Sequence, residues 1–417
     1  MELIPLFSAA LVTAALFSWL NHRFIKLPTA IGVLLVALGM SLGLSVLQWL
    51  GWDVRSSAAQ MLERLEFQHT LMDGMLAFLL FAGALHVDFE GLYGQKRPIL
   101  ALATVGVLVT TLLVGGATWV VFGALGFDFG FGPCLLFGAL ISPTDPIAVL
   151  AILKQARAPR SLETKIVGES LFNDGIGVVV FTVVLGFVAD TGHGPEPGIA
   201  SLFVHEVGGG VLLGLGCGAI AYWLMRSIED LHVELLITLA LAAGVYSLAG
   251  AVHSSGPLAV VVAGLFIGNT EQRWTADHEV SHAVRLFWEI ADDVLNTLLF
   301  VLIGLEVLVL EWQPRLVLAG AVAIPLVLLA RLVSVSGTIG VLRRFREFTP
   351  GVVRILTWAG LRGGISVALA LSIPVTVPAR GALLTITYVV VLFSILVQGL
   401  TVGPLVRRLV PTIGEPS

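Results

Sequence analysis

The feature that most constrains the fold is a succession of apolar stretches, each long enough to cross a bilayer, that recurs from one end of the chain to the other. An apolar stretch of about 18 or more residues with few charges is typical of a membrane-spanning helix. Of the 417 residues, 57% are hydrophobic and only 12% are charged, whereas soluble domains carry about 25% charged residues. The sequence therefore predicts an all-α polytopic membrane protein and excludes a soluble enzyme or a nucleic-acid-binding protein.

Thirteen segments are predicted to be membrane-spanning helices, of which the ninth is short. Most of the connections between them are short as well, which favours a compact bundle. The segments are residues 3–22, 28–49, 69–86, 98–123, 131–153, 161–189, 199–226, 231–251, 256–269, 285–310, 315–342, 350–373 and 380–406.

The lysines and arginines are distributed unevenly over the two sets of loops. Of the 23, 17 follow odd-numbered segments or lie in the C-terminal tail, four lie on the opposite side, and two fall within spans. Cytoplasmic loops carry an excess of Lys and Arg. We therefore expect an odd number of spans, an outside N-terminus and a cytoplasmic C-terminus.

The fifth segment carries a carboxylate between two prolines. In the sequence GALISPTDPIAVL, Pro143 and Pro146 bracket Thr144 and Asp145. A proline inside a helix removes a backbone hydrogen bond and clashes with the preceding turn. We expect the helix to open here and to place freed carbonyl groups beside the carboxylate, as in the cation sites of secondary transporters. The alternative is a kink with a satisfied aspartate.

The sixth segment carries a second carboxylate in the sequence VGESLFNDGIGV. Ser170 and Asp174 share one helix face, and Glu169 and Asn173 share the neighbouring face. Asp174 lies about 20 Å from the start of its segment at 1.5 Å per residue, so it reaches a depth similar to that of Asp145 from the opposite direction. Two adjacent carboxylates in a poorly hydrated site favour a bound proton unless a cation replaces it. The pair predicts competition between cation and proton, with a purely structural acid pair as the alternative.

The twelfth segment, with the sequence TWAGLRGGISVALA, carries an arginine among three glycines. A charge at mid-bilayer costs about 2.5–3.5 kcal/mol on insertion scales, so Arg362 requires a partner. We expect Arg362 to pair with Glu169, and the alternative partner of Glu169 is Arg331 in the eleventh segment. The glycines weaken the helix and allow close backbone approach.

The fifth and twelfth segments hold corresponding positions in two trios of segments. Each is the middle one of its trio, and seven spans separate them, so they run in opposite directions. This arrangement suits an inverted-topology repeat in which one interrupted helix from each half meets the other at the substrate site. The inference rests on position alone.

The residues required by several other function classes are missing from the sequence. It has no nucleotide-binding loop, no nucleophile–base arrangement and no cluster of cysteines and histidines. The net charge of −5 is diffuse and indicates no nucleic-acid partner. We therefore expect neither an enzyme nor a cofactor.

The motifs Thr144-Asp145-Pro146, GESLFND at 168–174 and GLRGG at 360–364 resemble those of the NhaP-type sodium/proton antiporters. These belong to the cation/proton antiporter superfamily, which is related to the animal sodium/proton exchangers. The resemblance extends to SGPLAVVVAGLFIGN at 255–269 and LNTLLFVLIGLE at 295–306. It covers nearly the whole span region.

The resemblance implies an ion site built from four residues. Asp174 would bind the cation and the competing proton. Asp145, Ser170 and the backbone carbonyl of Thr144 would complete the Na⁺ site.

The resemblance also implies roles for three neighbouring residues. Glu169, Asn173 and Arg362 would brace the core, and the neutral Asn173 is the mark of electroneutral one-for-one exchange in this family. Several family members have a Glu in the third helix that faces the site, whereas Phe81-Ala82-Gly83 contains none here.

The domain organisation implied by the resemblance is an antiporter fold in which interrupted helices cross in a core domain that moves against a dimerisation domain. A homodimer in a prokaryotic cell membrane is expected. The predicted parts are 1–93 (helices 1–3, dimerisation domain), 94–190 (helices 4–6, core), 191–310 (helices 7–10, linker helix and dimerisation domain) and 311–417 (helices 11–13, core, with a short cytoplasmic tail).

The function predicted from the sequence is electroneutral exchange of Na⁺, or its surrogate Li⁺, for H⁺ by alternating access, with these ions as substrates. The alternative is a potassium/proton antiporter of the same fold. A cation channel is a further alternative, although channels commonly place rings of carbonyls or charges around a pore, whereas these charges cluster within one chain.

Overall fold

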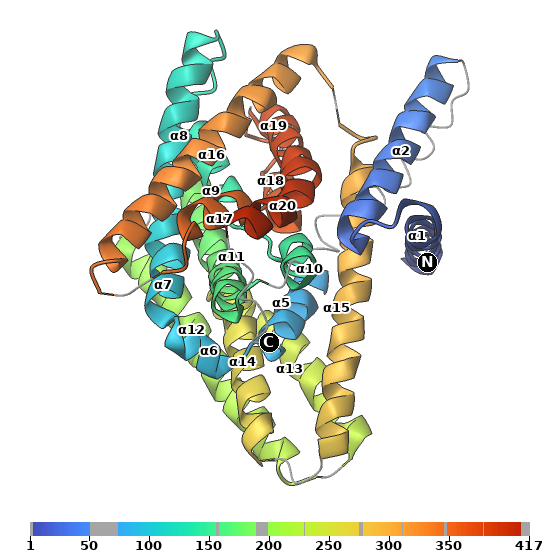
Figure 1. Cartoon of the computed structure of the whole chain (residues 1–417), viewed down its shortest axis with the longest axis vertical. Helices are drawn as coiled ribbons and strands as arrows, with labels where there is room; N and C mark the ends of the chain where they lie inside the picture. Colours follow the sequence, from blue (N-terminus) through green and yellow to red (C-terminus); the bar gives the residue numbers. More distant parts are fainter. Residues whose placement is uncertain are drawn as a thin grey trace, which may run out of the picture.

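A computed structural model shows a bundle of helices in which two helices are interrupted near the middle (Figure 1). The structure describes residues 3–50, 74–155, 158–188, 199–228, 230–274, 278–310, 312–345, 348–377 and 379–409. Within these ranges, helices overlap each of the thirteen predicted segments.

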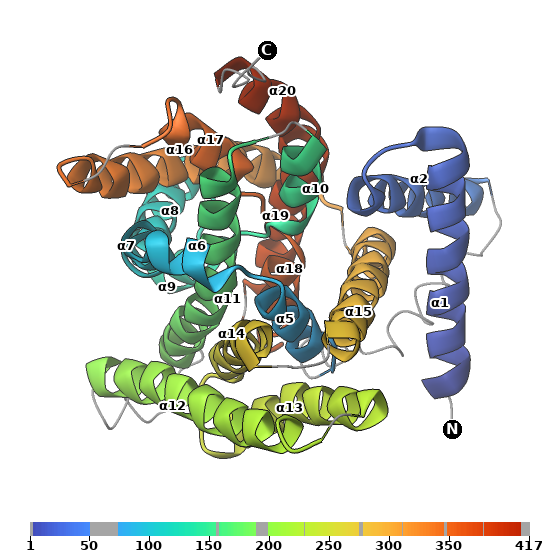
Figure 2. The same ribbon diagram turned by 60° about the horizontal axis from the view of Figure 1, so that its bottom comes forward.

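Seven helices outside the two predicted core trios form one part of the bundle. In Figure 2, α12 and α13 lie side by side along one flank, and α1 and α2 stand apart from them, with α15 between. Their bounds are α1 Leu3–Leu20, continued by the π-helical turn η1 Asn21–Ile25, α2 Thr29–Trp49, α5 Leu76–Leu85, α12 Ile199–Met225, α13 Leu231–Ala251, α14 Gly256–Trp274 and α15 His278–Glu306.

The remaining helices form two trios. The first contains the short α6 Phe89–Gly94, then α7 Lys96–Ala101, η3 Leu102–Gly106 and α8 Val107–Ala124 as one continuous helix, then α9 Phe131–Ile141 with α10 Ile147–Gln155, and α11 Arg160–Val188. The second contains α16 Pro314–Leu342, then α17 Val352–Ala359 with α18 Gly364–Leu371, and α19 Arg380–Phe393, η4 Ser394–Gln398 and α20 Gly399–Leu409 as one continuous helix.

The sequence-based prediction that the fifth and twelfth segments are interrupted is confirmed. Residues 142–146 separate α9 from α10, where Pro143 and Pro146 prevent a continuous hydrogen-bond ladder. Residues 360–363 separate α17 from α18, and three of the five residues 360–364 are glycine, the other two being Leu361 and Arg362. Each interruption therefore lies where the sequence weakens the helix, and we call them the first and the second break.

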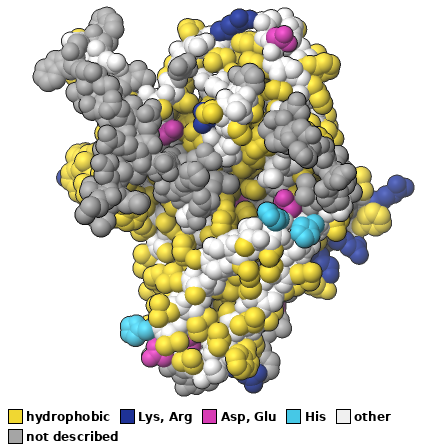
Figure 3. All heavy atoms as spheres, turned by 180° about the vertical axis from the view of Figure 1, so that it is seen from behind, with side chains coloured by type: hydrophobic (Ala, Val, Ile, Leu, Met, Phe, Trp, Pro, Cys, Tyr) yellow, Lys and Arg dark blue, Asp and Glu magenta, His cyan; other side chains and the backbone are white. Residues whose placement is uncertain are grey.

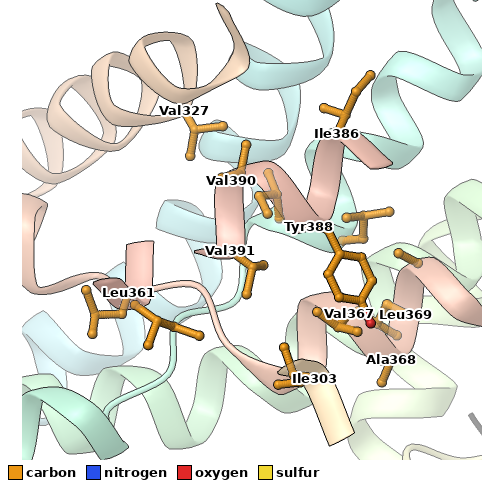
Figure 4. Close-up of a cluster of buried hydrophobic side chains, with 14 of the residues drawn as sticks. Ile303, Val327, Leu361, Val367, Ala368, Leu369, Ile386, Tyr388, Val390 and Val391 are labelled. Carbon is orange, nitrogen blue, oxygen red and sulfur yellow. The ribbon is translucent and has the colours of Figure 1, made fainter. Parts of the chain in front are cut away.

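The apolar character of the chain is visible both inside and outside the bundle. Within the described residues, seven helices are long and apolar enough to cross a membrane. Figure 3 shows hydrophobic side chains over most of the described surface in that view. Inside, Leu361 of the second break packs with Val390 and Val391 of α19 and with neighbouring residues of α18 (Figure 4). Packing thus fixes the second break within the core.

Candidate functional site

The first break is held by two polar residues of α11. The amide of Asn173 donates to the hydroxyl of Thr144 at 2.8 Å, and the backbone N–H of Thr144 donates to Oδ1 of Asn173 at 3.2 Å. The hydroxyls of Thr144 and Ser170 lie 3.1 Å apart and share a hydrogen bond. All three residues are buried, so these bonds replace those that the open helix has lost.

Asp145 lies between the N-terminal ends of two half-helices. Its side chain accepts the backbone N–H of Ile147 at 2.9 Å and so caps α10. Its carboxylate also lies against the backbone of Gly363, immediately before α18, so closely that a Cβ at Gly363 would overlap it. Helix N-termini carry partial positive charge. Both ends therefore stabilise a negative charge on Asp145.

The two breaks are joined directly. The backbone N–H of Asp145 donates to the carbonyl of Leu361 at 2.8 Å in an antiparallel bridge. The guanidinium of Arg362 donates to the carbonyls of Ser142 and Pro143 at 2.6 and 2.9 Å. Arg362 is only 2% exposed. It therefore supplies donors to the carbonyl groups that the first break has freed.

The predicted ion pair between Arg362 and Glu169 is wrong. Glu169 pairs with Arg331 of α16 instead, at 2.5 Å, which was the alternative that the sequence left open. Arg331 also donates to the carbonyl of Leu356 in α17 at 3.3 Å. The physical reason is that Arg362 is already occupied by carbonyl groups of the first break, which leaves Arg331 to neutralise Glu169.

A cavity of about 560 Å³ reaches the two breaks from the surface. Asp145, Asp174 and Thr144 all line it, so the structure brings these three predicted site residues together. Ser170 does not line the cavity, because it lies behind Thr144 and its hydroxyl contacts the hydroxyl of Thr144. Asp174 lies close enough to Asp145 for their charges to interact.

The outer part of the cavity is acidic, which the sequence-based prediction missed. Among the described residues, five acidic residues line the cavity besides the two site aspartates, together with one histidine, His86, and no Lys or Arg. The acidic residues are Asp88, Glu163, Glu289, Asp292 and Asp293. Like-charged walls concentrate counter-ions, here cations. The sequence offered little signal, since these residues come from three separate segments and lie near segment ends.

The wall contributed by the third predicted segment is apolar. Leu76, Leu79, Leu80 and Gly83 of α5 line the cavity. Ala82, in the stretch Phe81-Ala82-Gly83 that contains no Glu, is fully buried. The acidic groups of the cavity therefore come from elsewhere within the described residues, namely the first break, α11, α15 and the connection that follows α5.

The fold and the site define a class of protein. Two interrupted helices meet at buried carboxylates, and a cavity with acidic walls reaches them from the surface. Discontinuous helices that meet at the binding site are the mark of ion-coupled secondary transporters.

Comparison with known proteins identifies the family. The family described as sodium/hydrogen exchanger, transmembrane, matches residues 11–408, so the chain belongs to it. Among similar proteins, the Na⁺/H⁺ antiporter NhaP of Pseudomonas aeruginosa is 48% identical over 413 residues, covering 98% of this chain and 97% of that protein. The Na⁺/H⁺ antiporter NhaH of Halobacillus dabanensis is 34% identical, covering 93% of each chain.

A solved structure has the same fold. The sodium proton antiporter MjNhaP1 of Methanocaldococcus jannaschii, at pH 8, superimposes with a TM-score of 0.75, covering 98% of this chain and 99% of that chain. Its sequence identity is 21%, so this likeness concerns the fold alone.

Proposed function

We propose that the protein exchanges Na⁺ or Li⁺ for H⁺ across the membrane by alternating access, with one cation moved for each proton. The observation that carries the proposal is the placement of Asp174 and Asp145 in one cavity at the meeting point of the two breaks. Membership of the sodium/hydrogen exchanger family and the named activities of NhaP and NhaH support Na⁺ rather than K⁺ as the cation.

The two aspartates have different roles in this proposal. Asp145 lies against two helix N-termini, which favour its charged form. Asp174 lies in the middle of α11, 14 residues from either end, and has the charge of Asp145 nearby. Asp174 is therefore the group that alternates between proton and cation. Thr144 would contribute a backbone oxygen, and Ser170 would join as a fourth ligand by turning its hydroxyl from Thr144.

The moving part would be the two trios, which would be related to one another by an inverted repeat. The whole chain would have thirteen membrane spans. The bonds that hold both breaks join residues of these trios to one another, as in Thr144–Asn173, Asp145–Leu361 and Glu169–Arg331. The cavity separates these residues from α5 and α15, which line its other side. The core domain would consist of 94–190 and 311–417, and the other helices would form the dimerisation domain of a homodimer.

The exposed end of the cavity indicates which way the protein faces. His86, Asp88 and Glu289 are exposed and line the cavity. These residues adjoin loops that the charge bias assigns to the cytoplasm. With an outside N-terminus and a cytoplasmic C-terminus in a prokaryotic cell membrane, this conformation is open to the cytoplasm.

The experiment that tests the proposal measures proton movement in proteoliposomes that enclose a pH-sensitive dye. Asp174→Asn removes the exchangeable charge at almost constant volume. We expect Na⁺-dependent proton flux to fall at least 100-fold while the protein still folds and assembles. The matched control is Asp230→Asn, because Asp230 caps α13 with its side-chain oxygen, does not line the cavity and should leave the flux unchanged.

Four outcomes would contradict parts of the proposal. Full coupled flux in the folded Asp174→Asn variant contradicts the site. A proton flux driven better by K⁺ than by Na⁺ or Li⁺ makes the protein a potassium/proton antiporter. If a clamped membrane potential changes the rate, exchange is not electroneutral, and a non-saturating, uncoupled cation current indicates a channel.

A further inference from the structure

The last membrane-crossing helix of the chain contains a π-helical turn with two buried polar side chains. The turn, η4, separates α19 from α20 and runs from Ser394 to Gln398. Ser394 is 0% exposed and Gln398 is 3% exposed. π-Helical turns inside α-helices occur frequently at functional sites. Neither residue lines the ion cavity, so the mechanism proposed above leaves both without a role.

These two side chains hold the second break from both sides. The amide of Gln398 donates to the carbonyl of Trp358 at 2.9 Å, near the end of α17. The hydroxyl of Ser394 accepts the backbone N–H of Arg362 at 2.8 Å, just before α18. The same hydroxyl donates to Oε1 of Gln398 at 2.8 Å. One connected network thus satisfies a backbone acceptor and a backbone donor that the interrupted helix has left open.

The segment held by this network positions Asp145. Leu361 lies between Trp358 and Arg362, and its carbonyl accepts the backbone N–H of Asp145 at 2.8 Å. Gly363 lies against the carboxylate of Asp145. A shift of the second break would therefore shift the carboxylate that lines the ion site.

The first break is held in a similar way. Ser170 and Asn173, a hydroxyl and an amide, come from α11, the helix that follows the interrupted pair α9 and α10 in the chain. Ser394 and Gln398 are again a hydroxyl and an amide, from the helix that follows the interrupted pair α17 and α18. Each break is thus held by the next helix through neutral side chains.

We propose that Ser394 and Gln398 are positioning residues of the ion site, acting on Asp145 through the backbone of residues 358–363. The proposal rests on the proposed exchange function. Loss of either side chain would leave a buried backbone group without its partner, and the break would shift to satisfy it. Because Asp145 is bonded to that break, the expected effect is weaker cation binding rather than a slower maximal rate.

The test compares Na⁺-dependent proton flux in Gln398→Met and Ser394→Ala proteoliposomes over a range of Na⁺ concentrations. We expect the KM for Na⁺ to rise about tenfold in Gln398→Met and severalfold in Ser394→Ala, with the rate at saturating Na⁺ within about twofold of the parent. The double variant should resemble Gln398→Met alone, because residues in one hydrogen-bond network are not additive.

The matched control is Thr401→Val. Thr401 lies on α20, and its hydroxyl accepts the indole N–H of Trp358 at 2.8 Å, so this variant loses a bond to the same residue without touching the break's backbone. Its KM for Na⁺ should be unchanged.

An unchanged KM in Gln398→Met overturns the proposal even if the thermal stability falls. If Gln398→Met does not fold, Ser394→Ala decides, since an unchanged KM in that folded variant overturns the proposal equally. Failure of the proposed exchange function would be distinguishable from these outcomes, because the parent protein itself would then show no Na⁺-coupled proton flux.

Discussion

The two breaks solve the same structural problem with different chemistry. Both interrupt a membrane-spanning helix and leave backbone groups that must find partners inside the bundle. The first break places Asp145 on the cavity, whereas the second directs the guanidinium of Arg362 away from it, onto the carbonyls of Ser142 and Pro143. One break therefore presents a carboxylate to the cavity, and the other uses its charge to hold the first.

The comparison explains why a positive group can lie so close to a cation site. Nη1 of Arg362 donates to two backbone carbonyls, and the backbone N–H of Arg362 donates to the hydroxyl of Ser394. Within the described residues, the cavity lining contains neither Arg362 nor Arg331. The two core arginines thus stabilise the fold, while the Asp and Glu residues supply the acidic groups of the cavity lining among the described residues.

The largest expected effect comes from removing the charge of the second break. Arg362→Met deletes charge-assisted hydrogen bonds to two buried carbonyls, which should lower the free energy of unfolding by about 3 kcal/mol. Thermal unfolding in detergent measures the loss. Arg408→Met, which changes an exposed arginine near the end of α20, should leave the melting temperature unchanged. Equal melting temperatures for the parent and Arg362→Met would show that the second break does not hold the first.

The next effect separates the two functions of Asp145. Asp145→Asn retains a capping oxygen for α10 but removes the charge, so we expect Na⁺-dependent flux to fall about 100-fold with little change in stability. Asp145→Ala also loses the cap and should cost about 1 kcal/mol more in stability. Flux assays and thermal unfolding on both variants distinguish the roles. Substantial Na⁺-dependent flux in Asp145→Asn would mean that exchange does not require a charge at the first break.

The smallest of the three effects tests the contact between the breaks. Gly363→Ala adds a Cβ that overlaps the carboxylate of Asp145, so the carboxylate must move. We expect about a tenfold rise in the KM for Na⁺, measured from the flux. Gly381→Ala is the matched control, because Gly381 has open space around its Cα. If both variants keep the parental KM, the position of Asp145 does not depend on the second break.

The positions of the breaks and of the principal carboxylates were predictable from the sequence. Pro143 and Pro146 disfavour a regular helix, and a carboxylate between them at mid-membrane favours a functional site over a kink with a satisfied aspartate. The glycines around Arg362 mark the second break in the same way. These signals are local, so they do not depend on how the helices pack.

The side-chain partners were less predictable, because they depend on helix rotation and depth. Arg331 and Arg362 are both mid-span cations, and the sequence does not say which one faces Glu169. The carbonyls of the first break provided a clue, since freed acceptors require donors and a guanidinium has five. Ser394 and Gln398 were missed because neutral polar residues in an apolar span attract less attention than charges, although four-residue spacing in VLFSILVQGL was a usable signal.

The bridge between Asp145 and Leu361 has a consequence for the energetics of turnover. Because it ties four half-helices together, the ion can change its access without dismantling the groups that hold it. If the two trios move against the other helices as proposed, they would slide past leucines such as Leu76 and Leu80 of α5 and Leu299 of α15, which line the cavity. Apolar contacts are non-directional, so one set can replace another at similar free energy. The free-energy barrier between the two facing states would then come from rearranging apolar contacts rather than from breaking hydrogen bonds. The ion site would move as a rigid unit against apolar surroundings.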